Sequence, residues 1–184
     1  FESPSTSPAE RVRAASGRVA SASGTWVLIG ENVDHFGGVT LVGTSSLRAA
    51  AAVSPRTDGV ISIAARGPLG QEFSAQLPYS DEPADGLARR WWGLVHTLVQ
   101  RQVLSRDTSG MDITVESDVP VGAGLGALYA ADAAIALALA GGHDDVDTAP
   151  FRARLAEICS HAVDTYSSLP VLRARHSVAL RGAE

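Results

Sequence analysis

The sequence predicts an α+β fold, in which strands and helices are mixed along a single chain. Segments with the alternation of strands and segments with helical spacing follow one another without a strict strand–helix–strand order. The 184 residues, of which 45% are hydrophobic and 19% charged, suffice for one buried core. No internal repeat and no linker divides them. We therefore expect one domain over residues 1–184, with the Ser- and Pro-rich residues 1–10 as a loose lead-in.

Strands are expected where short apolar or alternating segments are bounded by turn residues. These segments are residues 26–30, 39–42, 60–65, 72–77 and 111–116. The third and fourth flank a turn that contains Gly and Pro, so they predict a hairpin. Residues 47–54 are small and apolar, which is compatible with a strand or with a short helix.

Helices are expected where apolar residues recur every three or four positions. Residues 87–104 follow this spacing and predict an amphipathic helix. Further helices are predicted at residues 128–140 and 151–166. The last apolar segment, residues 176–180, predicts a strand. The chain starts with Phe rather than Met and ends straight after this segment, which indicates a fragment or a processed piece.

Composition and charge make several classes of partner unexpected. The net charge is −5 and no run is dense in Lys or Arg, so neither a nucleic acid nor a membrane surface is expected. The longest apolar stretch, residues 130–142, is much shorter than the roughly 20 residues that span a bilayer. The first residues lack the basic start and apolar core of a targeting segment. The single cysteine, Cys159, cannot form an internal disulfide, and we expect a cytoplasmic protein.

A glycine-rich loop at residues 119–127, Val-Pro-Val-Gly-Ala-Gly-Leu-Gly-Ala, lies between a predicted strand and a predicted helix. Its glycines let the backbone approach a ligand, and free N–H groups at a helix start favour a phosphate. A tight strand-to-helix turn accounts for the same residues equally well. The loop also fits the dinucleotide-binding pattern, with Asp144 following at about 20 residues. We discount that reading because Pro120 interrupts the strand that should precede such a loop.

Two segments resemble the signatures of galactokinases, a family of the GHMP kinase superfamily. Residues 24–38, Gly-Thr-Trp-Val-Leu-Ile-Gly-Glu-Asn-Val-Asp-His-Phe-Gly-Gly, are similar to the sugar-binding signature. Residues 110–125 are similar to the second signature, in which a Gly-x-Asp strand leads into Val-Pro-x-Gly-Ala-Gly-Leu. The resemblance covers nearly the whole chain in order. It implies the N-terminal half of the GHMP kinase fold, a domain of the ribosomal-protein-S5-domain-2 type, with the family's C-terminal half absent from this chain.

The resemblance implies phosphoryl transfer from ATP, with Mg²⁺, to the anomeric hydroxyl of galactose. A small-molecule sugar and a nucleotide are the implied partners, and ATP and Mg²⁺ the implied cofactors. The positions that match the sugar-binding residues are Glu31, Asn32, Asp34, Gly37 and Gly38. The positions that match the nucleotide-binding loop are Gly122, Ala123, Gly124, Leu125 and Gly126.

Several positions depart from the family pattern. Thr25 stands where the family has an arginine, and loss of such a cation costs roughly 10³–10⁵ in rate in other phosphoryl transfers. Asn32 replaces a histidine, and residues 126–128 replace a run of serines. The acidic loop residues near His143 are interpreted as a solvated loop, so we predict no metal site there.

The family's catalytic aspartate has one candidate, Asp164, because residues 165–183 contain no Asp or Glu. One register keeps Asp164 in the catalytic role. The other, which we favour, puts Asp164 on the preceding helix and deletes the catalytic loop. Three functions follow: a weak or inactive sugar kinase, a non-catalytic regulatory protein that binds a sugar or nucleotide, or a structural domain without a ligand. The retained Glu31 and Asp34 favour a ligand.

Overall fold

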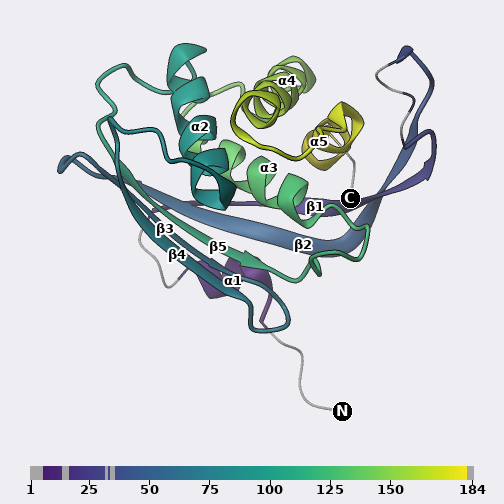
Figure 1. The fold of residues 1–184 in the computed structure, drawn as a ribbon, viewed down its shortest axis with the longest axis horizontal. Coiled ribbons are helices and arrows are strands. Elements are labelled where there is room, and N and C mark those ends of the chain that lie inside the picture. The colour runs from purple at the N-terminus through teal and green to yellow at the C-terminus, as the bar shows by residue number, and fades with distance from the viewer. Residues whose placement is uncertain (1–5, 14–16, 32, 34–35, 182–184) are drawn as a thin grey trace.

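The computed structural model describes residues 6–13, 17–31, 33 and 36–181. Four helices, α2 to α5, cover one face of a single sheet, and the short helix α1 lies against the other face (Figure 1). The predicted α+β class is therefore confirmed for the part of the chain described.

The sheet has five strands: β1 (Arg18–Ile29), β2 (Leu41–Pro55), β3 (Val60–Arg66), β4 (Glu72–Pro78) and β5 (Met111–Ser117). Their order is β1-β2-β5-β3-β4, and β3 pairs with β5 in parallel while the other pairs are antiparallel. The predicted β3–β4 hairpin is confirmed. Residues 47–54, for which strand and short helix were both open, belong to β2, where buried alanines pack under the helices.

The helices are α1 (Pro8–Val12), α2 (Gly86–Gln100), α3 (Ala127–Ala140), α4 (Ala149–Tyr166) and α5 (Arg173–Arg181). The predicted α2, α3 and α4 are confirmed. Residues 1–10 are not wholly a loose lead-in, because α1 begins at Pro8. Ser7 and Glu10 form a capping box that satisfies backbone N–H groups at its start.

The strand predicted at residues 176–180 is wrong, because these residues lie in α5. His176, Ala179 and Leu180 are buried, which is the spacing of one helix face. A run this short does not separate a strand from a helix by periodicity alone. Contacts of α5 with α3 and α4 decide in favour of the helix.

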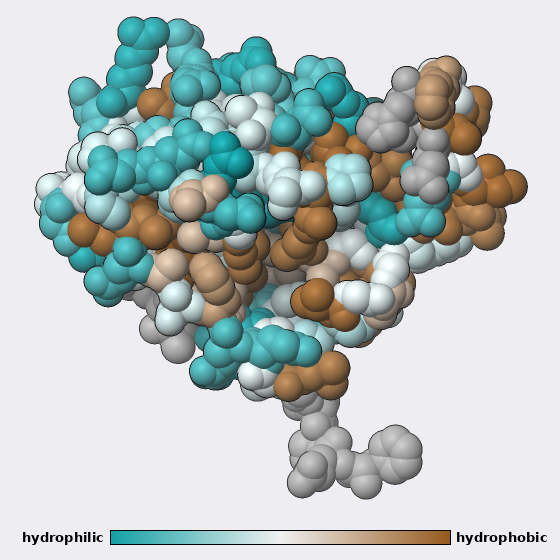
Figure 2. All heavy atoms as spheres, in the orientation of Figure 1, coloured by the Kyte–Doolittle hydropathy of each residue, from teal (hydrophilic) through white to brown (hydrophobic). Residues whose placement is uncertain are grey.

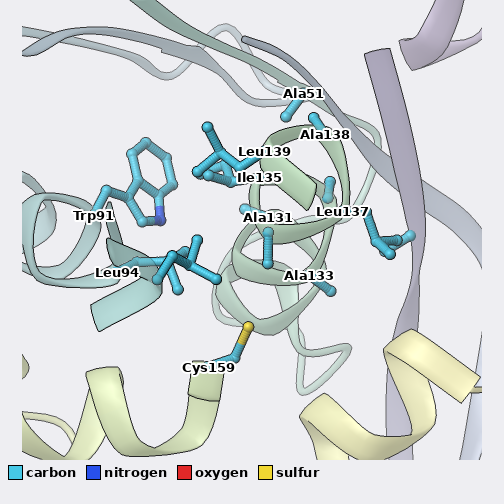
Figure 3. Close-up of a cluster of buried hydrophobic side chains, with 14 of the residues drawn as sticks. Ala51, Trp91, Leu94, Ala131, Ala133, Ile135, Leu137, Ala138, Leu139 and Cys159 are labelled. Carbon is cyan, nitrogen blue, oxygen red and sulfur yellow. The ribbon is translucent and has the colours of Figure 1, made fainter. Parts of the chain in front are cut away.

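The core is centred on α3, which is buried on all sides between the sheet and the other helices. Its many alanines let neighbouring backbones approach closely. Figure 3 shows Trp91 and Leu94 of α2 beside Ile135 and Leu139 of α3, and Cys159 of α4 directed at α3. This packing fixes the start of α3, and with it the glycine-rich loop, relative to the sheet.

The β1–β2 pair projects beyond the helices at one end of the molecule (Figure 1). Apolar side chains gather on the surface there (Figure 2). Leu28, Ile29, Val39 and Leu41 are all more than half exposed. No helix among the described residues is long and apolar enough to cross a membrane.

Candidate functional site

The glycine-rich loop connects β5 to α3 and is held against β1. Gly122, Gly124 and Gly126 have φ of +81°, +75° and +64°, a backbone region that favours glycine. Gly126 is also crowded, since a Cβ atom there would lie 2.5 Å from Thr25 Oγ1. The Thr25 N–H donates to the Leu125 carbonyl at 2.9 Å. The glycines are therefore required by the loop geometry whether or not a ligand binds.

A cavity of about 390 Å³ lies beside this loop. Its walls are the loop, the first turn of α3, residues 169–172 and the start of α5, and Glu31 lies at its rim just after β1. The two predicted motifs, which are about 90 residues apart in the sequence, thus meet at one cavity. A larger cavity of about 670 Å³ lies at the other end of α3 and α5 and contains none of the predicted site residues.

The structure brings together only some of the predicted residues. Glu31, Gly122, Gly124 and Gly126 line the cavity. Ala123 is exposed on the loop but does not line the cavity. Leu125 packs partly against the core.

Two other predicted sugar-binding positions, Gly37 and Gly38, do not line the cavity. Gly37 and Gly38 lie in the β1–β2 connection, where the Gly38 N–H donates to the Val33 carbonyl at 2.9 Å. Asn32 and Asp34 lie outside the described residues.

Asp164 lies on α4 with its side chain exposed, and it does not line the cavity. This is the position expected from the register that deletes the catalytic loop. Glu31 is the one acidic side chain that the described residues contribute to the cavity wall.

The sequence analysis missed Arg175, the basic residue of this cavity. Its guanidinium is buried, and Nη1 donates to the carbonyls of Thr25 at 2.7 Å and Gly124 at 3.0 Å. Nη2 lies 3.6 Å from a carboxylate oxygen of Glu31. A cation therefore reaches the position of Thr25 from α5, although Thr25 itself carries no charge. The signal that could have revealed it is an Arg-His pair on the buried face of a helix.

Tyr129 joins the cavity wall to the interior. Its hydroxyl donates to the Pro170 carbonyl at 3.3 Å and accepts the Leu172 N–H at 3.0 Å. The guanidinium carbons of Arg90 and Arg175 each lie 5.7 Å from the centre of the Tyr129 ring. The residue therefore ties residues 170–172 to α3, and its ring lies near two guanidinium groups.

Beneath Tyr129 lies a buried cluster that the sequence analysis also missed. Asp132 accepts hydrogen bonds from Arg90, from Trp91 Nε1 at 3.0 Å and from His176 Nε2 at 3.0 Å. Ser160 lies 3.0 Å from His176 Nδ1. Burial opposes ionisation of Asp132, but the Arg90 charge and the hydrogen bonds from His176 and Arg90 outweigh it and lower its pKa to about 2.

Ser160, His176 and Asp132 are hydrogen-bonded in the order of a Ser-His-Asp hydrolase triad, but all three side chains are buried. Ser160 is 2% exposed, so a substrate cannot reach its hydroxyl. The cluster is therefore suited to holding α2, α3, α4 and α5 together rather than to nucleophilic catalysis.

The fit of the site to ATP and to Mg²⁺ differs. The start of α3 has no side-chain cap, so its free N–H groups can donate hydrogen bonds to phosphate oxygens, and Arg175 adds a positive charge. Mg²⁺ requires oxygen ligands. Residues 126–128 offer no hydroxyl, and no group of three His, Cys, Asp or Glu side chains among the described residues could hold a metal ion. The described residues thus fit a phosphate group, and Glu31 is the one carboxylate that they offer at the cavity to a metal ion.

The chain is similar to known proteins in its structure, and no match was found for its sequence. No protein-family model matches the sequence, and no curated protein matches it significantly. Mevalonate kinase of Methanococcus jannaschii is similar with a TM-score of 0.68 and 14% identity, over 90% of this chain and 51% of that one. Galactokinase of Lactococcus lactis, solved with galactose, is similar with a TM-score of 0.67 and 14% identity, over 93% of this chain and 44% of that one.

A D-glycero-D-manno-heptose 1-phosphate kinase of Bacteroides thetaiotaomicron is similar with a TM-score of 0.62 and 18% identity, over 90% of this chain and 54% of that one. The chain thus spans about half the length of these kinases. Their shared fold is that of the N-terminal domain of GHMP-superfamily kinases, and the predicted fold is confirmed.

Proposed function

We propose that this chain is a galactokinase-like domain that binds a sugar at the glycine-loop cavity and is impaired in transferring a phosphoryl group to it. The observation that carries the proposal is the meeting of Glu31 and the glycine-rich loop at one cavity, where the charge of Arg175 is held by backbone carbonyls.

Sugar binding is supported by the carboxylate at the rim. The Glu31 side chain is 66% exposed, so it can accept hydrogen bonds from sugar hydroxyls without first being uncovered. Asp34 is its proposed partner, on the resemblance to the sugar-binding signature. Two such carboxylates select among sugar epimers by geometry, because a misplaced hydroxyl leaves one of them without its hydrogen bond.

ATP is the proposed second ligand, and when bound it supplies the phosphoryl group. The free N–H groups at the start of α3 and the Arg175 guanidinium are the groups that would hold its phosphates. The Gly122 and Gly124 backbones face the cavity, and a Cβ atom at either would meet nothing within 4 Å, so there is room for a ligand beside the loop.

Impaired transfer follows from the same contacts. Phosphoryl transfer depends on positioned cations and on a group that accepts the proton of the attacking hydroxyl. Arg175 Nη1 is committed to the Thr25 and Gly124 carbonyls, and Glu31 partly offsets its charge. Asp164 is exposed on α4 and does not line the cavity. We therefore infer a domain that binds its ligands better than it converts them.

The alternative is a regulatory protein that binds a sugar or a nucleotide without any catalysis. It is favoured by the apolar Leu128, which lines the cavity in the stretch where the resemblance expects serines.

The experiment measures ADP release with Mg-ATP and a panel of hexoses that includes galactose, and calorimetric binding of galactose and of ATP. Asp34→Ala is the test variant, and Asp144→Ala, at an exposed loop position away from the cavity, is the matched control. Sugar binding with little or no turnover, lost in Asp34→Ala alone, supports the proposal. Brisk sugar-dependent turnover overturns the impairment. Absence of binding by galactose, the other hexoses and ATP overturns the proposed ligand site.

A further inference from the structure

The buried cluster beneath the cavity joins four helices through hydrogen-bonded polar side chains. Arg90 comes from α2, Asp132 from α3, Ser160 from α4 and His176 from α5; we call these four residues the His176 cluster. Their exposed fractions are 4%, 1%, 2% and 0%. Every described buried side-chain polar atom has a hydrogen-bond partner, so this cluster is fully satisfied. Such a network fixes one arrangement of its helices.

Two contacts carry the geometry of this cluster to the cavity. His176 follows Arg175 directly on α5, so the placement of its ring fixes the residue that binds the Thr25 and Gly124 carbonyls. The ring of Tyr129 packs edge-on against His176, with their centres 4.8 Å apart, and its hydroxyl holds residues 170–172.

We propose that His176 is a positioning residue of the glycine-loop cavity: its neutral imidazole, bridged between Ser160 and Asp132, holds Arg175 and Tyr129 in place, and its protonation releases them. The consequence for ligand binding rests on the proposed function, whereas the effect on the cavity wall does not.

The hydrogen-bond directions explain why protonation matters. Ionised Asp132 only accepts, so His176 Nε2 carries a hydrogen and donates to it. His176 Nδ1 then accepts the hydrogen of the Ser160 hydroxyl. Adding a proton makes both ring nitrogens donors, so the Ser160 hydroxyl has to turn and donate elsewhere. The cluster would then hold two cations, His176 and Arg90, against the single carboxylate of Asp132.

The charged and titratable groups around His176 act in opposing directions. Asp132 from α3 favours the protonated ring, whereas Arg90 from α2 disfavours it. The other titratable or charged groups nearby are Tyr129 of α3, whose ring packs against His176, the buried Cys159 of α4, and Arg175, which precedes His176 on α5. Burial has the largest effect, so the pKa of His176 lies below its ordinary value and the ring is neutral at pH 7.

The test is an NMR titration of the whole chain without ligand, from about pH 8 to about pH 4.5, across the range in which histidines change charge. The indole N–H of Trp91 reports on the cluster, because it donates to Asp132. The backbone N–H of Leu172 reports on the cavity wall, because it donates to Tyr129. His176→Gln supplies a neutral donor toward Asp132, and His161→Gln, at an exposed position of α4, is the matched control.

In the parent chain and in His161→Gln, the Trp91 and Leu172 signals are expected to shift with one midpoint, that of the His176 ring. In His176→Gln both signals should lose that transition and stay near their neutral-pH positions. Galactose affinity should fall about twofold at the midpoint, since half of the molecules then retain the competent cavity.

A Leu172 signal that does not follow His176 overturns the proposal. So does an unchanged transition in His176→Gln, or global acid unfolding with no earlier change at the cavity, because the cluster would then serve stability alone. If galactose does not bind but Leu172 follows His176, the positioning role holds and the proposed function fails.

Discussion

Replacing Asp132 with asparagine (Asp132→Asn) is expected to lower the free energy of unfolding by about 3–5 kcal/mol, the range found when one partner of a buried ion pair is removed. The carboxylate is 1% exposed and the partner Arg90 is 4% exposed, so water cannot take the place of either. The change keeps the size of the side chain and removes its charge. The loss therefore measures electrostatics and hydrogen bonding rather than a cavity.

The magnitude follows from the donors that converge on Asp132. Arg90 Nε and Nη2, Trp91 Nε1 and His176 Nε2 all donate to its two oxygens. Asparagine keeps one accepting oxygen and presents an NH₂ group where the other oxygen was. At least one donor then faces a donor, and Arg90 keeps a buried charge without a counter-charge. Its remaining hydrogen bond, to Ser167 at 3.3 Å, is to a neutral hydroxyl.

Urea unfolding followed by circular dichroism measures the effect, and Asp118→Asn is the matched control. Asp118 pairs with Arg11 at 2.7 Å, but its side chain is 32% exposed, so its loss should cost at most about 1 kcal/mol. The double variant Arg90→Met with Asp132→Asn should recover part of the loss, because no unpaired charge remains. If Asp132→Asn costs no more than Asp118→Asn, the reasoning about this buried pair is refuted.

Three further predictions concern packing, pH and reactivity. Gly93→Ala should destabilise the α2–α4 contact by about 1–3 kcal/mol in thermal unfolding, because its Cβ would lie 2.2 Å from the Tyr166 ring; an unchanged Tm would contradict this packing. The folded-state pKa of His176 is lowered, so the unfolded chain binds more protons below about pH 6.5. Stability should therefore fall as the pH drops below that value, and less steeply in His176→Gln; equal slopes in urea unfolding would argue against it. Burial and the nearby Asp132 charge raise the pKa of the Cys159 thiol, so a thiol reagent should label it only after unfolding, and fast labelling of the folded chain would contradict its burial.

Local patterns were enough to predict most of the elements. Alternation and turn residues located the β3–β4 hairpin and β5, and helical spacing located α2, α3 and α4. These features depend on neighbours a few positions apart, so they can be read from one sequence. The position of the glycine-rich loop could also be predicted from the sequence, because left-handed backbone at residues 122, 124 and 126 favours glycine there. Its resemblance to a kinase signature led to the fold that the structural neighbours confirm.

The sequence by itself thus determined the α+β class, most strands and helices, and the position of the loop, because each follows from periodicity or backbone sterics. Only the tertiary structure decided that residues 173–181 form a helix, that Arg175 reaches Thr25 and that Asp164 faces solvent. These outcomes depend on contacts between residues far apart in the chain; Arg175 and Thr25, for example, are 150 positions apart. A single sequence carries no local signal for such a contact, since it arises only when the helices pack on the sheet.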